Sequence, residues 1–482
     1  MLKGYTYEYL SPDNFDLPNA KVHGNVLGPD AQAFKALVVR ANDSMTVEGA
    51  MKLSEFAQNG LPVIFSGGIP SAYLGTNSPE AVQRAQKVLN STSLLSNVYV
   101  TSSPDELAYK LASIGVLPAT KFESPTPSWY TLLRSDAANG IDYYYIYNDE
   151  PCLSLGEGSS NATIEFNSTG YPYIFDAWTG EKTPILTYTQ SDLSTTIPIT
   201  LAGNQSTIIA LSQQHLVDGI PATHVESVSD NVLGSVVLNN GSISLKATGG
   251  SLSYKTAGGQ SVNVSVPETN PITLTNWNLT VEHWDPPTDL LNIEDGAAKH
   301  NTTHILPHLV SWQQVSGLQN VSGRGFYSTS FQWPSSPTSL PQNSSSGAII
   351  DFGPVVHSLS VQLNGHALPA LDVTSATADI SQWLVEGENT VLAEVATPLG
   401  NVLATIWHQL MTSGTGPSST EDGVPPPVTA NYGLIKDVTI QPYWNIVVSE
   451  EFIKEPHIKV NGVKSYVSVL KELLPMALQK IL

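Results

Sequence analysis

Cysteine is almost absent from this sequence of 482 residues, in which Cys152 stands alone. A disulfide framework and a thiolate metal cluster are therefore excluded, and packing must hold the fold. Charge is also scarce, at 13% of the residues, and one-sided, with 42 acidic against 21 basic side chains and a net charge of −21. Such a surface repels nucleic acid and anionic membranes, so neither is predicted as a partner. No apolar run approaches the roughly 18 residues of a spanning helix, and the chain is expected to be soluble.

Sequence signatures of nucleophilic and phosphoryl chemistry are missing as well, since there is no G-x-S-x-G elbow and no glycine-rich phosphate loop. Ser66-Gly67-Gly68 follows an expected strand, but an amidotransferase-like nucleophile there would be a cysteine, so the glycines are interpreted as a tight turn. His304 and His308 are four apart, but Pro307 removes the helix that would present both to zinc, and they are interpreted as strand or loop histidines. We predict no metal and no cofactor.

Hydrolysis of a glycosidic bond needs two carboxylates that face each other across the sugar, one of them with a raised pKa. The sequence holds many acids but offers no means of choosing such a pair, so the catalytic residues stay unknown. Those beside aromatic or turn residues are interpreted as turn or strand-edge acids, and the one before two prolines as a strand terminator. They are Asp13, Asp176, Glu181, Glu282, Asp285 and Asp379.

The chain is long enough for about three units, each with its own core. Its first part alternates apolar runs of strand length with segments of helical periodicity, which predicts three β-α units and a parallel sheet with helices on its faces. Ser44 and Ser78 are expected to cap the first two helices. The expected strands are residues 34–39, 61–65 and 97–100, and the expected helices are residues 44–57, the segment after Pro79 and one opening at Ser103.

Prolines within residues 117–128 mark a boundary, beyond which the helical period disappears. Short β-branched and aromatic segments follow between turns, which predicts a β-sandwich. Residues 225–266 either extend it or form a small one of their own, and a second long β region follows. The expected strands are residues 140–148, 161–167, 183–188, 206–211, 273–281, 325–332, 348–352, 359–363 and 390–395, with polar loops at 335–347 and 412–431 and the end of the core near Val448.

Eleven N-x-S/T sites predict a glycosylated exterior and a eukaryotic secretory route. The residues after Met1 lack the apolar core of a signal peptide, so we expect one upstream of this chain. The alternative is a cytosolic protein with accidental sites. The asparagines are Asn42, Asn90, Asn161, Asn167, Asn204, Asn240, Asn263, Asn278, Asn301, Asn320 and Asn343.

The second β region also holds side chains suited to a carbohydrate. Aromatic faces stack on the C–H faces of sugars, and an arginine fork holds hydroxyls. Aromatic residues of a sandwich more often belong to its core, and that alternative stays open. The candidate carbohydrate-binding residues are Trp284, Trp312, Arg324, Tyr327 and Trp333.

Three segments resemble the jelly-roll sugar-binding domain of family 2-type glycoside hydrolases. Asn364-Gly365-His366 matches the end of a V-x-V-N-G hairpin, residues 379–384 match a D-I-(S/T)-x-x-L turn, and residues 386–391 match a G-x-N-x-(I/L/V) strand start. The physical sense is that Asn-Gly makes a tight hairpin and that Asp379 caps the turn through its side-chain oxygen. These signatures concern the fold and not catalysis.

Two earlier stretches are similar to glycoside hydrolase family 106, the α-L-rhamnosidases, and to their fungal secreted relatives. Residues 175–181 resemble the D-x-x-T-G-E strands that follow the barrel in such enzymes, and residues 9–15 resemble the segment just past it. The resemblance covers roughly residues 5–448. In that family the acid and base glutamates lie in an N-terminal (β/α)₈ barrel, and this sequence has no such repeat to receive them.

The resemblance and the periodicity together imply a multidomain fold, with a small flavodoxin- or amidotransferase-like α/β domain followed by β-sandwich and jelly-roll, galactose-binding-like domains. The expected functions are a glycosidase-like protein inactive alone, a secreted carbohydrate-binding accessory protein, or an enzyme recruited to a fungal biosynthetic pathway. The expected partner is an oligosaccharide, polysaccharide or glycoside. The expected domains are residues 1–125 (α/β), 126–270 (sandwich), 271–449 (jelly roll) and 450–482 (a divergent tail).

Overall fold

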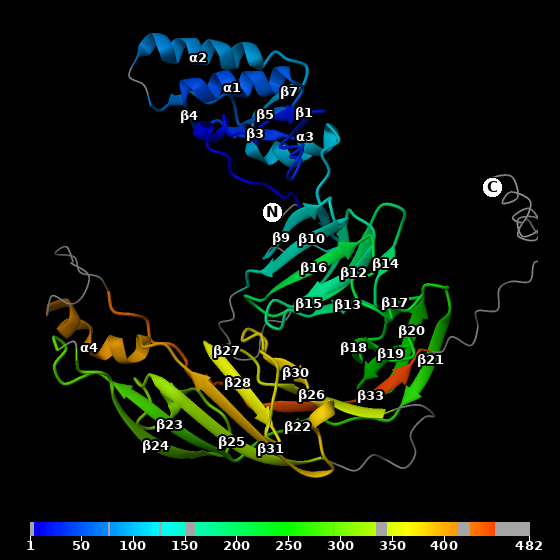
Figure 1. The fold of residues 1–482 in the computed structure, drawn as a ribbon, viewed down its shortest axis with the longest axis vertical. Coiled ribbons are helices and arrows are strands. Elements are labelled where there is room, and N and C mark those ends of the chain that lie inside the picture. Colours follow the sequence, from blue (N-terminus) through cyan, green and yellow to red (C-terminus); the bar gives the residue numbers. More distant parts are fainter. Residues whose placement is uncertain are drawn as a thin grey trace, which may run out of the picture.

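The structure is a computed structural model that describes residues 4–75, 78–124, 128–150, 160–292, 294–333, 345–412 and 425–448. In this part of the chain strands predominate, and Figure 1 shows a helical unit at the N-terminal end followed by β units. Cys152, Asn343 and the predicted tail lie outside the described residues, as do most of the two predicted polar loops. None of the described helices is both long and apolar enough to cross a bilayer.

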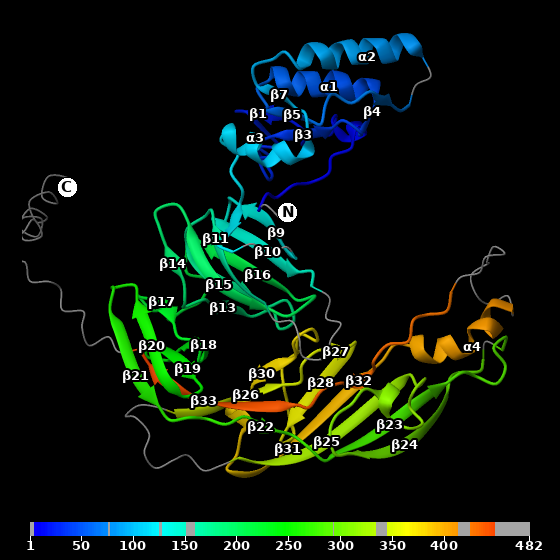
Figure 2. The same cartoon turned by 180° about the vertical axis from the view of Figure 1, so that it is seen from behind.

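The N-terminal unit is built on a three-stranded parallel sheet, as predicted. Its elements are β3 Leu37–Arg40, α1 Val47–Gln58, β5 Val63–Ser66, α2 Pro79–Thr92, β7 Val98–Thr101 and α3 Leu107–Ser113. The strand β5 lies between β3 and β7, and all four of its residues are buried, as expected for a central strand that is covered on both faces. The helices α1 and α2 pack together on one side of the sheet and α3 lies on the other (Figures 1 and 2).

One of the two predicted helix caps of this unit is confirmed. Ser78 Oγ accepts a hydrogen bond from Ala81 N at 3.3 Å. The prediction for Ser44 is wrong, because this residue lies in β4 (Ser44–Met45) and Thr46 Oγ1 accepts instead from Gly49 N at 2.9 Å, the first-turn donor within reach of a cap. The other short elements here are η1 Pro12–Asn14, β1 Val22–His23, β2 Val26–Leu27, β6 Ala72–Tyr73 and η2 Pro104–Glu106.

The next unit, the first sandwich, consists of two facing antiparallel sheets. Its strands are β8 Thr120–Phe122, β9 Trp129–Asp136, β10 Ile141–Asn148, β11 Ser160–Phe166, β12 Tyr171–Phe175, β13 Lys182–Pro184, β14 Thr189–Gln190, β15 Thr195–Leu201 and β16 Ser206–Ser212. The order is β13-β12-β16-β10-β9 in one sheet and β14-β15-β11-β8 in the other. The core between the two sheets includes Trp129, Tyr144 and Phe166. Because β8 pairs with β11, the sandwich begins before the expected boundary at residue 126.

Residues 225–266 form a small β unit with a core of its own. Its strands are β17 Val225–Val228, β18 Val232–Val237, β19 Ile243–Ala247, β20 Gly250–Thr256 and β21 Ser261–Val266. The sheet β17-β20-β21 covers β18 and β19, and Leu245 and Leu252 are fully buried between the two layers. This packing favours a small sandwich over a mere extension of the first one, although Leu186 also joins its core.

The C-terminal β unit, residues 272–448, has the largest core of the chain, which includes Trp277 and Phe352. A six-stranded sheet of order β24-β23-β25-β31-β28-β29 faces a sheet that contains β33-β26-β30. The elements are β22 Ile272–Thr273, β23 Trp277–Asp285, β24 Ala298–Leu306, η3 Trp312–Gln314, β25 Gly323–Trp333, β26 Ser345–Asp351, β27 Val355–Val356, β28 Ser358–Leu363, β29 His366–Ala367, β30 Thr377–Asp379, η4 Ser381–Trp383, β31 Gly387–Ala396, α4 Gly400–Thr412, β32 Gly433–Leu434 and β33 Thr439–Val447.

Two local predictions for this unit are confirmed. Asn364 and Gly365 have φ values of 51° and 81°, as a two-residue hairpin turn requires, and they join β28 to β29. Asp379 Oδ1 accepts a hydrogen bond from Ser381 N at 3.0 Å and so caps the turn η4. Two features were not expected from the sequence: the helix α4, and the start of β26 inside the segment predicted as a polar loop.

The strand β33 contributes to two cores at once. One edge of β33 pairs with β26 over residues 439–445, and its other edge pairs first with β22 and then with β19. Ile440 is buried in the core of the C-terminal β unit and Trp444 in that of the small β unit. An ion pair reinforces this junction, since Asp379 Oδ2 accepts from Lys246 Nζ at 2.5 Å and from Tyr443 Oη at 2.6 Å. The predicted turn acid therefore also fastens the two units to each other.

We expect Asp379→Asn to lower the free energy of unfolding by roughly 1–3 kcal/mol, because Lys246 loses its counter-charge in a largely buried place. Burial opposes ionisation of Asp379, but hydrogen bonds from Lys246, Ser381 and Tyr443 outweigh it and hold its pKa below the ordinary value. The stabilisation is thus present above a pH of about 4 and is lost as pH falls through the lower folded pKa.

Urea unfolding followed by tryptophan fluorescence, at neutral and acid pH, measures this effect. Asp16→Asn is the matched control, because the Asp16 side chain is 78% exposed and lies 3.7 Å from its nearest lysine. A difference between the two variants that does not shrink in acid would contradict the proposed role of the ion pair.

Candidate functional site

The structure buries two of the five predicted sugar-contact residues. Trp312 is 0% exposed and Tyr327 is 1% exposed, and both belong to the core of the C-terminal β unit. Trp312 Nε1 donates to Tyr327 Oη at 2.7 Å, and Leu434 N donates to the same oxygen at 3.1 Å. The predicted sugar contact is wrong for these two, because a ring without exposed surface cannot stack on a ligand. Both residues are core residues, which is the alternative that the sequence left open.

The other three predicted sugar contacts retain some exposed surface. Trp333 is half-buried at the end of β25, where it packs against the core. Trp284 and Arg324 lie on the outer face of the six-stranded sheet, where Trp284 Nε1 donates to Glu282 Oε1 at 2.6 Å and Arg324 Nε donates to Glu394 Oε1 at 2.8 Å. A role in sugar contact stays a prediction for these three residues.

Two of the candidate acids are unsuited to donate a proton to a leaving group. The hydrogen bond from Trp284 lowers the pKa of Glu282 most. Burial opposes this, but contacts with Lys299 lower the pKa further, so it lies below its ordinary value. The pKa of Asp379 is lowered too, by the contacts described above. A glycosidase acid needs a raised pKa, so neither carboxyl group fits that role.

The remaining candidate acids also lie where the sequence analysis expected them, at turns and strand ends. Asp176 Oδ1 accepts from Trp178 N at 2.8 Å and so closes the turn after β12. Asp285 ends β23 and contacts His300, with 2.8 Å between Oδ2 and Nδ1. Asp13 and Glu181 are exposed, in η1 and in a turn respectively.

The other sequence features singled out for chemistry have structural roles. Gly67 and Gly68 have φ values of 77° and 123°, so they form the tight turn predicted after β5. His304 lies in β24, with Nε2 3.0 Å from Thr302 Oγ1. His308 lies in a loop, with Nδ1 2.8 Å from Asp437 Oδ2. The interpretation of the two histidines as strand and loop residues is confirmed.

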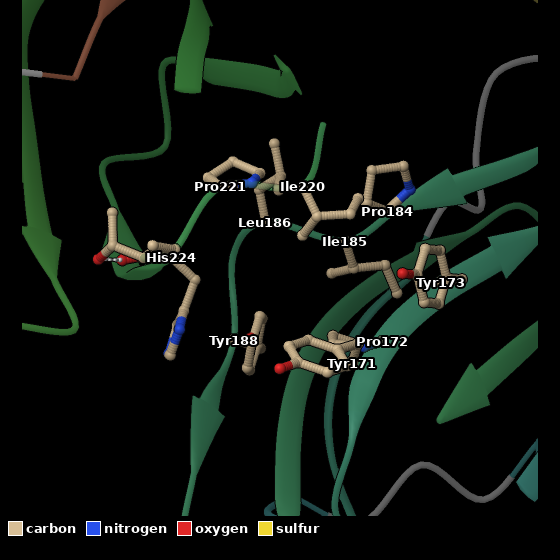
Figure 3. Close-up of a pocket in the computed structure, with 12 residues that line it drawn as sticks. Tyr171, Pro172, Tyr173, Pro184, Ile185, Leu186, Tyr188, Ile220, Pro221 and His224 are labelled. Atoms are coloured by element: carbon tan, nitrogen blue, oxygen red, sulfur yellow. Dashed lines mark hydrogen bonds between the residues drawn. The ribbon is translucent and has the colours of Figure 1, made fainter. Parts of the chain in front are cut away.

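A small hollow lies where the first sandwich meets the small β unit (Figure 3). Tyr171 and Tyr188 line one side, and Leu186, Ile220 and Pro221 lie opposite. Its volume of ≈ 50 Å³ has room for a few water molecules and not for a sugar ring. We therefore interpret it as a packing gap between the side chains of the two units.

A larger hollow lies on the outer face of the five-stranded sheet of the first sandwich. Its volume of ≈ 320 Å³ reaches the range of ligand pockets, about 300–1,000 Å³. It is therefore the candidate binding site, and we call it the aromatic groove. Its lining residues are Leu132, Arg134, Tyr143, Tyr145, Phe175 and Ile208.

Strand alternation and register build the aromatic groove. Along β10, Tyr144 and Ile146 are 0% exposed in the core, so Tyr143 and Tyr145 must point to the opposite face. The pairing of β9, β10, β16 and β12 then sets four of the lining side chains in one row across the sheet: Leu132, Tyr145, Ile208 and Phe175. The lining is therefore fixed by the same register that fills the core.

The chemistry of the aromatic groove suits an uncharged polar ligand with apolar faces. Tyr145 is 42% exposed, and the rings of Tyr143 and Phe175 meet edge to face with centroids 5.4 Å apart. Arg134 forms an ion pair with Glu8, while its Nη1 is buried without a hydrogen-bond partner among the described residues. Aromatic rings and a partly exposed guanidinium can hold a sugar. Among the described residues that line the groove there is no Asp or Glu, although Glu8 pairs with Arg134 at this place.

Sequence reasoning identified the strand but not the groove. The segment GIDYYYIYN was correctly predicted as β, and its alternating tyrosines are the signal that could have drawn attention to one face. Which tyrosines face outward depends on the pairing of β10 with its hairpin partner β9 and with β16, whose residues are distant in the sequence. That pairing cannot be read from the segment itself.

We expect His224 to make stability fall in mild acid. Burial lowers the pKa of His224, and nearby Glu226 offsets only part of this. The unfolded chain takes up a proton near about pH 6.5 and the folded chain only at lower pH, so the free energy of unfolding falls as pH drops below about 6.5. His224→Gln should lose less stability than the unchanged protein between about pH 7.5 and about pH 5.5 in urea titrations. The exposed His23→Gln is the control, and equal slopes for the two variants would contradict the expectation.

No protein-family profile matches the chain, and no curated protein sequence matches it. Among solved structures, a rhamnosidase from Novosphingobium sp. PP1Y is similar, with a TM-score of 0.53 and 15% identity over 90% of this chain and 36% of that chain. A beta-glucuronidase from Faecalibacterium prausnitzii is similar over 37% of this chain and 32% of its own, with a TM-score of 0.21 and 17% identity. This chain thus spans about a third of the Novosphingobium enzyme's length and has the fold of that part of it.

Proposed function

We propose that this chain is a non-catalytic, carbohydrate-binding part of an α-L-rhamnosidase-like glycoside hydrolase, whose acid and base act from a barrel outside these residues. The observation that carries the proposal is the fold likeness, which extends over 90% of this chain and 36% of a rhamnosidase. The resemblance of residues 9–15 and 175–181 to family 106 points to the same relationship.

The assignment of a non-catalytic role is supported by the surroundings of the acids. Neither of the two hollows described above is lined by Asp or Glu. Glu282 and Asp379 have lowered pKa values and satisfied hydrogen bonds, which suits structural anions and not proton donors. The carboxyl groups named above are therefore part of the scaffold.

The carbohydrate-binding role is assigned to the aromatic groove. Tyr145 offers an exposed ring face, and Tyr143 and Phe175 widen the platform. Arg134 also lines the groove, and its side chain is 42% exposed, so the accessible part of its guanidinium can donate to a sugar hydroxyl. The groove is open to solvent along the sheet, which suits a single residue or the end of a glycan.

Secretion with N-glycosylation fits the positions of the predicted sites. All ten sequon asparagines within the described ranges are exposed, while the three buried asparagines, Asn148, Asn389 and Asn401, lie outside sequons. A glycan needs a side chain that reaches solvent. We therefore infer a glycosylated, secreted protein, with a fungal source as its most natural setting given the resemblance.

We also infer the finer fold assignments. The parallel order of β3, β5 and β7 suits a flavodoxin- or amidotransferase-like domain, and the Asn364-Gly365 hairpin with the Asp379 turn suits a galactose-binding-like jelly roll. The first sandwich starts at β8, and the small β unit is divided from it near residue 225.

Tyr145→Ala is expected to weaken glycan binding at least about tenfold, or about 1.4 kcal/mol, because it removes the exposed stacking face. The measurement is retention of the purified chain on an array of rhamnose-containing oligosaccharides, followed by calorimetry with any glycan retained. Tyr109→Ala is the matched control, since Tyr109 is 79% exposed on α3, away from the groove. Trp284→Ala tests the site predicted from the sequence. If this variant loses glycan binding while Tyr145→Ala keeps it, the binding site lies in the C-terminal β unit and not in the aromatic groove.

The same preparation is expected to release no aglycone from aryl α-L-rhamnosides, because no acid and base pair lines the hollows. Turnover that survives further purification of the chain would refute the non-catalytic assignment. Absence of retention of any glycan would refute the binding role and leave the fold relationship untouched.

Expression through a eukaryotic secretory pathway, with a signal peptide supplied, is expected to give a chain whose mass falls on enzymatic release of N-glycans. Asn240→Gln should remove one glycan, because Asn240 is an exposed sequon asparagine in the β18–β19 turn. The adjacent Asn239→Gln is the control, since Asn239 is exposed but outside a sequon. An unchanged mass on glycan release would argue for the cytosolic alternative.

A further inference from the structure

A second group of polar side chains lies on the hairpin of β23 and β24, outside the aromatic groove. His283 and His300 pair directly across the hairpin, and Asp285, two residues after His283, lies on the same face. Each residue offers one ligand atom, and these three atoms lie within 4.8 Å of one another. We propose that His283, Asp285 and His300 form a binding site for a divalent transition metal ion, with zinc as the preferred ion.

The backbone sets the three side chains at a distance that a metal can bridge. Directly opposed residues of an antiparallel pair have Cβ atoms about 4.5–5.5 Å apart, so two imidazoles can reach one ion between the strands. The rings of His283 and His300 are stacked, with centroids 4.2 Å and planes 27° apart, so the rings must rotate to turn their lone pairs towards one ion. Zinc bonds of about 2.0–2.1 Å put tetrahedral ligand atoms a little over 3 Å from each other, so this rotation must also bring the ligand atoms up to roughly 1.5 Å closer together.

The buried ligand is held in position by neighbouring groups. His283 is 6% exposed, and its Nε2 lies 2.8 Å from Thr302 Oγ1. Thr302 Oγ1 in turn lies 3.0 Å from His304 Nε2. A hydroxyl between two imidazoles fixes the orientation and the tautomer of each ring. Hydrogen-bonding groups next to metal-bound histidines have the same effect. Gly323, opposite His283 on β25, has no side chain to crowd this ring.

The donor set indicates the class of metal. Two imidazole nitrogens and one carboxylate oxygen suit zinc and neighbouring first-row ions, whereas calcium and magnesium prefer oxygen ligands throughout. The side chains of His300 and Asp285 are 54% and 43% exposed, so an ion can enter from solvent and keep water as a fourth ligand. Bound there, it would clamp the hairpin where the chain turns between β23 and β24.

The site differs from what the sequence suggested. The sequence predicts no metal, because Pro307 removes the helix that would present His304 and His308 together, and it predicts a strand terminator at Asp285. The ligand set found here is brought together by cross-strand register, which no spacing along the chain displays. It is independent of the proposed sugar binding, which involves another sheet.

Zinc titration of the untagged full-length chain, stripped with a chelator and dialysed, tests the proposal. We expect one zinc ion per chain by elemental analysis and, with cobalt, the visible absorption of a tetrahedral site. His300→Ala and Asp285→Ala should each weaken zinc binding at least tenfold by competition with a chromophoric chelator, because each removes one of three ligands. Both side chains are about half exposed, so these variants are expected to fold.

His308→Ala is the matched control. His308 is also an exposed histidine next to an aspartate, with 2.8 Å between Nδ1 and Asp437 Oδ2, but this pair is not part of the three-ligand group. Binding in the control that equals the unchanged protein, together with loss in His300→Ala, supports the site. Absence of stoichiometric zinc in the unchanged protein, or equal weakening in His308→Ala and His300→Ala, would overturn it.

Discussion

The pairing of β33 with strands from two units is the constraint on which the β part of this chain depends. One edge of the strand pairs with β26 of the C-terminal β unit, and the end of its other edge pairs with β19 of the small β unit. Ile440 and Trp444 therefore lie in different cores although they are four residues apart. Because a strand is rigid over this length, the two units are held in a fixed relation, and neither core is complete without the end of the described chain.

Several charged side chains reinforce this framework. Lys246, Asp379 and Tyr443 meet at the junction that β33 makes, and Glu282 and Glu394 pair with cations on the outer face of the six-stranded sheet. The pKa values of Asp379 and Glu282 are lowered, which is the opposite of what a general acid needs.

Binding chemistry arises at two places where strand register aligns side chains across a sheet. In the aromatic groove, the core positions Tyr144 and Ile146 force Tyr143 and Tyr145 to the outer face beside Phe175. On the β23–β24 hairpin, the pairing of His283 with His300 brings two imidazoles to one carboxylate. Both places use the same alternation that fills the cores, so the scaffold and its candidate sites are consequences of one pattern.

The sequence by itself determined the elements and the local turns. Periodicity predicted the α/β alternation and most strands, and Asn364-Gly365 and Asp379 predicted their turns, since these depend on residues close together in the chain. Tertiary structure alone decided that Trp312 and Tyr327 are core residues, that β33 serves two cores, and that the groove and the histidine cluster exist. The physical reason is that burial and cross-strand neighbours depend on which distant strands pair, and alternation along one strand is the same whichever of its faces meets the core.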